Sequence, residues 1–228
     1  MERKKLTPWL GLITLIGSQL LVLFGVAIWL WSFPRGGIWI ATPLGAFTIS
    51  AISGLAALAV PAIFSHASTT TDVIDIFEFK ALRQGVNVSA PVIGILLGGI
   101  GILVVRCHLG GDVGNASMAK YFVPEVGVTK YLFATLLLIG PIVEEIVIRG
   151  FLYRAFRRSY HVVFSISAIV LVAMVIHWNV IASSIWVLFL LAGLQVILCL
   201  LLERTHNLWN CIVCHLAYNV MLLLADGI

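Results

Sequence analysis

The sequence has few charged residues. Only 11% of its 228 residues are Asp, Glu, Lys or Arg, whereas 61% are hydrophobic. A soluble globular domain carries roughly 25% charged residues and about 45–50% apolar ones, so this composition cannot cover a water-facing surface. The mean hydropathy of +1.09 likewise indicates a strongly apolar chain. The shortage of charge excludes an ordinary soluble protein and predicts a polytopic membrane protein.

Basic residues are too dispersed for a nucleic-acid-binding protein. The 14 Lys and Arg give a formal net charge of +4, but they are spread among hydrophobic stretches and form no continuous basic face. We therefore expect the lipid bilayer as a partner and no nucleic acid.

Cysteine is also scarce, and the four cysteines give no clear disulfide framework. Cys211-x-x-Cys214-His215 has the spacing of a c-type haem attachment site, but it lies inside an apolar stretch that would bury the haem in a helix. We interpret these two cysteines, together with Cys107 and Cys199, as small buried residues.

Long apolar runs fill most of the chain. A bilayer core about 30 Å thick needs roughly 20 helical residues per crossing, and we predict an all-α bundle of about seven transmembrane helices in a single membrane domain, residues 1–228. Residues 110–129 leave room for a short interfacial helix, which would make eight. The predicted spans are 9–33, 43–64, 90–106, 131–153, 162–178, 183–202 and 207–225.

Small residues recur every four positions in two of these spans. Ala46, Ser50 and Gly54 form one such series, and Gly94 with Gly98 forms another. Small residues at this spacing let helices approach closely in lipid, so we interpret both series as packing surfaces.

The positions of the basic residues indicate the orientation in the membrane. With a cytoplasmic N-terminus, ten Lys and Arg fall on the inner side and four on the outer side, if Arg149 is counted with the end of its helix. The positive-inside rule then predicts that the N-terminus is cytoplasmic. The first span is too long for a signal peptide and lacks a clear cleavage site, so we interpret it as a retained helix. The membrane would be the plasma membrane of a bacterium or archaeon, or the endoplasmic reticulum of a eukaryote.

The fourth span contains three charged residues, Glu144, Glu145 and Arg149. A charge at the centre of a span costs about 2.5–3.5 kcal/mol, whereas each large apolar residue returns only about 0.3–0.6 kcal/mol. Glu145 and Arg149 are four residues apart and can form an ion pair. Glu144 lies about 100° round the helix from Glu145, and Pro141 is expected to kink the helix before them. Ionisable residues inside a span indicate a functional site.

Two later spans place further polar residues at a similar depth. Four residues lie roughly 17 to 24 Å from the cytoplasmic end of their own helices: Glu144, His177, His215 and Asn219. A carboxylate and an imidazole can remove a proton from water, and a second imidazole with a carboxamide can donate hydrogen bonds to an oxyanion. These residue types favour a hydrolase.

The same residues resemble the motifs of the CPBP family of intramembrane proteases, which includes CAAX prenyl endopeptidases and the bacterial Abi or bacteriocin-processing proteins. The matching motifs, within residues 130–224, are Glu144-Glu145-x-x-x-Arg149, then His177, and then His215-x-x-x-Asn219. The family usually has Phe four residues before the second-motif histidine, where this chain has Ala173. This departure puts the shape of the site in question more than its chemistry.

The resemblance implies a glutamate-dependent intramembrane peptidase with residues 130–224 as its catalytic core. Glu144 would activate water, His177 would assist it, and His215 with Asn219 would stabilise the tetrahedral intermediate. Glu145 and Arg149 would orient or balance the first glutamate. The substrate would be a peptide or protein, prenylated if it is of the CAAX type.

We expect no cofactor. The family has also been described as metal-dependent, however, and a carboxylate with two histidines could hold zinc. The ligands would then be Glu144, His177 and His215.

The alternative is a membrane protein without catalytic activity. A transporter, or a bacteriocin self-immunity protein, could use the same buried Glu, His and Arg side chains as an ion relay or a structural pair.

Overall fold

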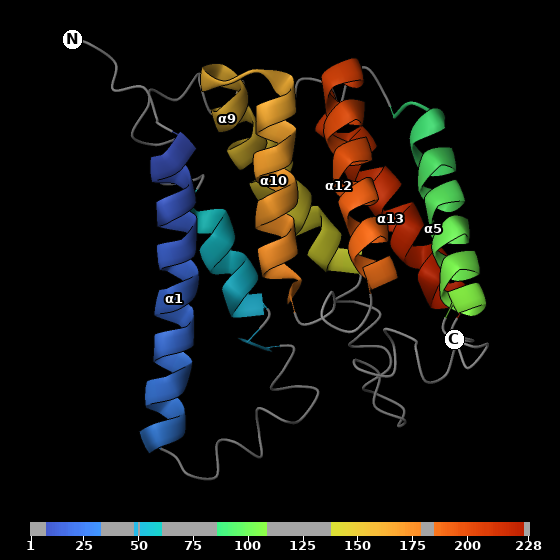
Figure 1. Cartoon of the computed structure of the whole chain (residues 1–228). Coiled ribbons are helices and arrows are strands. Elements are labelled where there is room, and N and C mark those ends of the chain that lie inside the picture. The colour runs from blue at the N-terminus through green and yellow to red at the C-terminus, as the bar shows by residue number, and fades with distance from the viewer. Residues whose placement is uncertain are drawn as a thin grey trace.

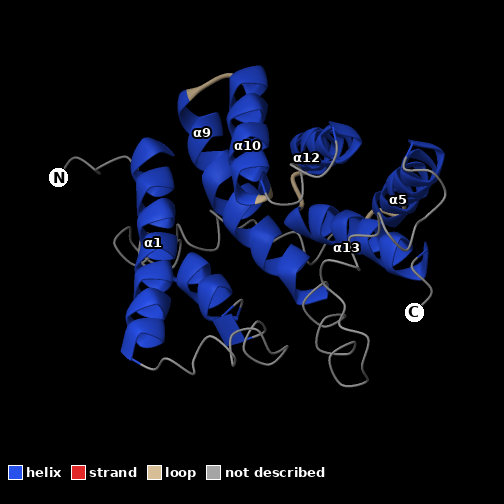
Figure 2. Ribbon diagram, turned by 60° about the horizontal axis from the view of Figure 1, so that its bottom comes forward, coloured by secondary structure: helices blue, strands red, loops and turns tan. Residues whose placement is uncertain are grey.

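The structure, a computed structural model, describes residues 8–32, 48–49, 51–60, 86–108, 138–178 and 185–225. Within these ranges the elements are helices and no strand occurs (Figure 2), so the prediction of an all-α protein is confirmed. Residues 51–60 and 138–144 are helical. The other elements are α1 (Pro8–Ser32), α5 (Ser89–His108), η2 (Glu145–Tyr153), α9 (Arg154–Ser159), α10 (Val162–Ile176), α12 (Ile185–Thr205) and α13 (Leu208–Ala225).

Where the structure describes them, most helices follow the predicted spans to within a few residues, but the fourth continues through α9 to Ser159, beyond the predicted end at 153. The expected interfacial helix at 110–129 lies outside the described residues. Of the described helices, Pro8–Ile28 and Ile185–Thr205 are each long and apolar enough to cross a membrane, and four shorter helices are apolar. A crossing needs about 20 residues, so the number of spanning helices stays a prediction.

The outer surface of the helices is apolar. On α1 the side chains of Leu21 and Phe24 are 71% and 64% exposed, and on α10 that of Val175 is 75% exposed. The buried interior, in contrast, includes charged and polar side chains such as Glu145 and Arg149. Large apolar side chains that face outward need a nonaqueous surrounding, and this arrangement fits a helical bundle in lipid.

The helices stand side by side, with α1 at one edge of the bundle and α5 at the other (Figure 1). The start of α1 lies at the same end as the end of α9, because Trp9 Nε1 donates a hydrogen bond to the Tyr160 hydroxyl at 2.9 Å. The start of α5 lies beside the start of α13, because the backbone N–H of Asn87 donates to Asn210 Oδ1 at 2.8 Å. The termini of several helices therefore meet at one end of the bundle.

Four arginines lie at this end, which we call the arginine end: Arg154, Arg157, Arg158 and Arg204. Arg157 joins α9 to α12, since its Nε donates to Glu203 Oε1 at 2.8 Å and its Nη2 donates to Oε2 at 3.2 Å. Arg149, by contrast, is fully buried. Counting Arg149 among the orientation signals is therefore wrong, because a guanidinium neutralised inside the bundle does not report which side faces the cytoplasm.

The helix that carries the paired glutamates is irregular. Residues 138–144 are α-helical, but from Glu145 to Tyr153 the chain forms a π-helix, η2, before α9 continues to Ser159. A π-helix is rare and is often found at functional sites. The kink predicted at Pro141 stays a prediction, and the π-helix that begins four residues later was not predicted.

α5 packs closely against α13 through its glycines. A Cβ atom added at Gly94 would lie 2.1 Å from the backbone oxygen of Cys214, and one at Gly98 would lie 2.5 Å from Met221 Cβ. The predicted packing role of these two glycines is confirmed. A Cβ at Gly54 would lie 3.7 Å from a Val143 methyl group, whereas Ala46 and Ser50 fall outside the described residues.

Candidate active site

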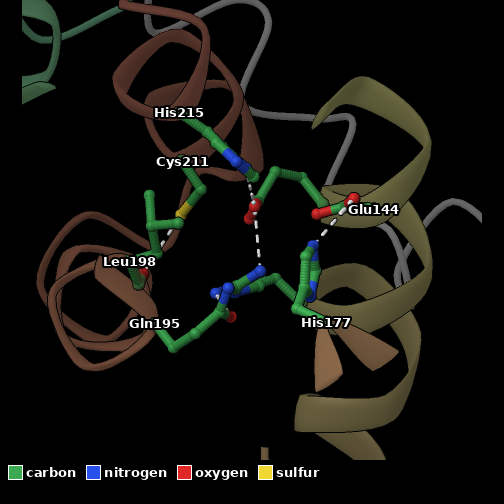
Figure 3. Close-up of polar contacts among 8 residues, drawn as sticks. Glu144, His177, Gln195, Leu198, Cys211 and His215 are labelled. Atoms are coloured by element: carbon green, nitrogen blue, oxygen red, sulfur yellow. Dashed lines mark hydrogen bonds and ion pairs between the residues drawn. The ribbon is translucent and has the colours of Figure 1, made fainter. Parts of the chain in front are cut away.

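Side chains from η2 and α13 meet in a buried polar cluster (Figure 3). Glu145 is fully buried, and its Oε1 accepts hydrogen bonds from Arg149 Nη1 at 2.9 Å and from His215 Nδ1 at 2.8 Å. Because an ionised carboxylate only accepts, His215 carries a proton on Nδ1. The ion pair predicted between Glu145 and Arg149 is present. The contact between Glu145 and His215, 70 residues apart, was not predicted.

Gln195 on α12 extends this cluster and was missed by the sequence reasoning. Its side chain is fully buried, and its Oε1 accepts a hydrogen bond from Arg149 Nη2. The signal was available, because Gln195 is a single polar residue in the apolar run 185–202. Within the described ranges, three buried atoms of the cluster have no hydrogen-bond partner: Glu145 Oε2, Arg149 Nε and Gln195 Nε2. Two of these atoms, Arg149 Nε and Gln195 Nε2, are hydrogen-bond donors, and Glu145 Oε2 is an acceptor.

Glu144 faces a different histidine. Its Oε1 lies 3.7 Å from His177 Nε2, at the end of α10 (Figure 3). The side chains of Glu144 and His177 are 32% and 24% exposed, respectively. A separation of 3.7 Å is too long for a direct hydrogen bond. Glu144 and His177 thus form a second, more accessible pair beside the buried one.

The backbone of α10 orients His177. The residue caps the C-terminus of α10, and its Nδ1 lies 3.0 Å from the carbonyl oxygen of Ala173. A carbonyl only accepts, so Nδ1 donates, and the ring directs its Nε2 toward Glu144. The side chain of Ala173 is fully buried. The departure from the family's Phe therefore changes packing, whereas a backbone carbonyl holds the ring.

α13 carries the third predicted motif. His215 is nearly buried, and with Nδ1 bound to Glu145 its Nε2 is the nitrogen left for another partner. Asn219 follows one helical turn later and is partly buried. The structure thus brings five of the predicted residues into two neighbouring groups: Glu144 with His177, and Glu145 with His215 and Arg149.

The predicted zinc ligands do not converge. In the part of the chain that the structure describes, no group of three or more His, Cys, Asp or Glu side chains is arranged to hold a metal ion. Glu144 faces His177, whereas His215 is engaged with Glu145. A zinc site needs at least three protein ligands around one point, and the arrangement of these side chains does not fit one.

The cysteines are packing residues with one exception. Cys199, Cys211 and Cys214 are buried as predicted, and Cys211 Sγ donates to the Leu198 carbonyl of α12 at 3.3 Å. For Cys107 the prediction of burial is wrong, because its side chain is exposed at the surface of α5 near the end of that helix.

Comparison with known families matches residues 127–221 to the family described as type II CAAX prenyl endopeptidase Rce1-like. No curated protein and no solved structure matches the chain. Both groups of the candidate site, together with Asn219, fall within the matched segment. With the apolar helices, the match fits an integral membrane protein. Residues 127–221 therefore match the Rce1-like family of CAAX proteases, in agreement with the resemblance of the motifs to the CPBP group.

Proposed function

We propose that the protein is an intramembrane endopeptidase in which Glu144 activates the attacking water. The observation that carries this proposal is the unequal environment of two adjacent carboxylates. Glu145 is fully buried, and its Oε1 holds both Arg149 and His215, so this carboxylate is part of the buried cluster. Glu144 is partly exposed and lies beside His177. Glu144 is therefore the carboxylate free to exchange protons with a substrate.

Glu144 and His177 would hold the attacking water between them. The carboxylate and the Nε2 lone pair are both acceptors, so one water molecule can donate an O–H to each. When the water oxygen bonds to the peptide carbonyl carbon, one of its protons moves to Glu144. His177 keeps the water oriented, because the Ala173 carbonyl fixes its ring. General base catalysis of this kind typically contributes about 10²–10⁴-fold.

His215 and Asn219 would stabilise the negative charge that develops on the carbonyl oxygen. The Asn219 amide can donate directly. His215 Nδ1 already donates to Glu145, so Nε2 can donate only when both ring nitrogens are protonated. The carboxylate of Glu145 fixes the orientation of the ring, as a buried carboxylate does beside a catalytic histidine.

The reaction is completed by returning the proton. Collapse of the tetrahedral intermediate breaks the C–N bond, and protonated Glu144 gives its proton to the leaving amine. The reaction balances with peptide and water alone, so we propose no cofactor.

The substrate is proposed to be a peptide of the CAAX type or a leader or bacteriocin peptide. The helices around the site present apolar side chains outward, so a substrate with a prenyl chain could approach within the bilayer. We further propose that the N-terminus and the arginine end face the cytoplasm, since the remaining basic residues still favour that side.

The first test is cleavage of a panel of quenched fluorescent peptides, prenylated and not, by the purified full-length protein. Glu144→Gln keeps the size of the side chain but removes the base, so turnover should fall at least about 100-fold with unchanged thermal unfolding. Glu203→Gln, which makes the same chemical change at the arginine end, is the control and should stay active.

Three results would count against the proposal. A folded, fully active Glu144→Gln variant would exclude Glu144 as the base. Loss of wild-type activity with a chelator would favour the metal-dependent alternative. Ion flux in proteoliposomes that survives His215→Ala, without any peptide cleavage, would favour a transporter.

A further inference from the structure

We propose that Gln195 is a positioning residue of the site, because it holds Arg149 in a position that lets Glu145 also bind His215. Gln195 lies on the buried face of α12, and its Oε1 accepts a hydrogen bond from Arg149 Nη2 (Figure 3). An amide inside an apolar helix is costly to bury unless it is hydrogen-bonded, and polar side chains in membrane helices typically bond to another helix. Gln195 makes such a bond with the buried arginine of η2.

The ion pair between Arg149 and Glu145 uses only part of its hydrogen-bonding capacity. Arginine and carboxylate groups frequently pair through two parallel hydrogen bonds, which use both carboxylate oxygens. Here Arg149 Nη1 donates to Glu145 Oε1 at 2.9 Å. Among the described residues, Glu145 Oε2 and Arg149 Nε have no hydrogen-bond partner. The pair is therefore held by one bond, although both groups could form a second.

Gln195 accounts for this single bond. It occupies Nη2, the nitrogen that with Nη1 forms one donor fork of the guanidinium group. Glu145 Oε1 thus accepts from Arg149 Nη1 at 2.9 Å and from His215 Nδ1 at 2.8 Å. Without Gln195, the buried Nη2 and Oε2 atoms would both lack a partner, and a second bond between them would satisfy each. That bond would turn the carboxylate toward Arg149 and away from His215.

Gln195 therefore orients a histidine of α13 through two intermediate side chains. Gln195 fixes Arg149, Arg149 leaves Glu145 Oε1 shared, and this oxygen fixes the ring of His215. The expected effect on catalysis rests on the proposed function, since His215 is assigned there to the oxyanion. The effect on the contact between Glu145 and His215 does not depend on any activity.

The contact is tested by nuclear magnetic resonance on the full-length protein in lipid nanodiscs, with isotope-labelled histidine. The hydrogen-bonded Nδ1 proton of His215 should give a downfield signal, assigned by its loss in His215→Gln. Gln195→Met keeps the length of the side chain but replaces a strong acceptor by a weak one, so the signal should be lost. Gln195→Glu still offers an oxygen to Arg149, so the signal should remain.

Gln19→Met is the matched control. It makes the same chemical change on α1, where Gln19 exchanges hydrogen bonds with Ser53 rather than with the cluster. The His215 signal should be unchanged in this variant.

Peptide cleavage gives the second readout. In Gln195→Met, kcat should fall about tenfold, the equivalent of one hydrogen bond, and KM should be unchanged, because the substitution misplaces His215 rather than the substrate. Gln195→Glu should restore kcat, and Gln19→Met should cleave like the wild type.

A His215 signal that persists in a folded Gln195→Met variant would overturn the proposal. An equal loss of the signal in Gln19→Met would also overturn it, because it would indicate a general loosening of the bundle. If Gln195→Met does not fold, as judged by circular dichroism, Gln195→Asn takes its place, since its shorter side chain withdraws the acceptor from Arg149. If the signal is lost as expected but the wild type cleaves no peptide, the positioning of His215 is supported and the proposed function alone fails.

Discussion

At the residue scale, adjacent glutamates have distinct environments because their side chains leave the helix in different directions. Glu145 points into the bundle and binds Arg149 and His215, whereas Glu144 points toward α10 and faces His177. One carboxylate is committed to structure and the other is available for proton transfer. The same helix can therefore stabilise the site and supply its base.

Gln195 offers a test of the buried cluster. Gln195→Leu removes the acceptor of Arg149 Nη2 and leaves a buried N–H unsatisfied, which costs about 1–3 kcal/mol. We expect a lower thermal unfolding temperature and a reduced kcat with little change in KM, measured on the purified protein. An unchanged unfolding temperature would contradict the importance of this hydrogen bond.

Ala173 offers a test of packing behind His177. Restoring the family's residue, Ala173→Phe, would force a large ring into a fully buried position, and overpacking of this kind costs about 1–3 kcal/mol. We expect a destabilised protein in thermal unfolding. Val175→Phe, on the same helix at a side chain that is 75% exposed, is the control and should unfold like the wild type. Equal stability of the two variants would show that the core has room for the ring.

The sequence predicted a contact within one helix, but not which residues of different helices contact each other. The spacing of Glu145 and Arg149 predicted their ion pair, since both lie on one segment. Depth along each helix predicted that His177 and His215 lie near the glutamates. Which glutamate each histidine faces depends on the rotation of each helix about its axis, and apolar residues all round a buried helix do not define that rotation.

At the scale of elements, the contact between α5 and α13 sets the position of His215. Gly94 lies against the backbone of Cys214, the residue before His215. The motif histidine is therefore supported by a helix that lies outside the matched family segment.

Gly94→Ala should displace this part of α13. Its Cβ would lie 2.1 Å from the Cys214 oxygen, so one helix must shift, at a cost of about 1–3 kcal/mol. We expect lower thermal stability together with reduced peptide cleavage. The control is Gly99→Ala on the same helix, where an added Cβ meets no atom within 4 Å. If Gly94→Ala cleaves peptide as fast as Gly99→Ala, α5 does not position His215.

The elements themselves were largely predictable, whereas their local geometry was not. Runs of apolar residues located α1, α10, α12 and α13 to within a few residues, because a membrane-spanning helix is defined by length and hydropathy. The π-helix from Glu145 to Tyr153 was not predicted. Its hydrogen-bond register depends on tertiary packing, and Pro141 indicated only that the helix would be disturbed.

At the scale of the whole molecule, the bundle has two different ends. The arginine end carries the tie between α9 and α12, and His177 lies at the opposite end of α10 from it. α10 runs for 15 residues between them, about 22 Å. Composition predicted a membrane protein, and the structure shows that the two ends of the bundle carry different functional groups.

The exposure of Cys107 makes the chain behave toward thiol reagents as a protein with one cysteine. The other three thiols are buried, and Cys107 lies near the end of α5 that is farther from Asn87 and the arginine end. If the arginine end is cytoplasmic, Cys107 lies on the outer side. A membrane-impermeant maleimide added to intact cells should then label the wild type once, and Cys107→Ser should abolish the label. Labelling only after the cells are opened would reverse the assigned orientation. The native sequence thus carries its own reporter of sidedness, and a dye attached there would leave the interior of the bundle untouched.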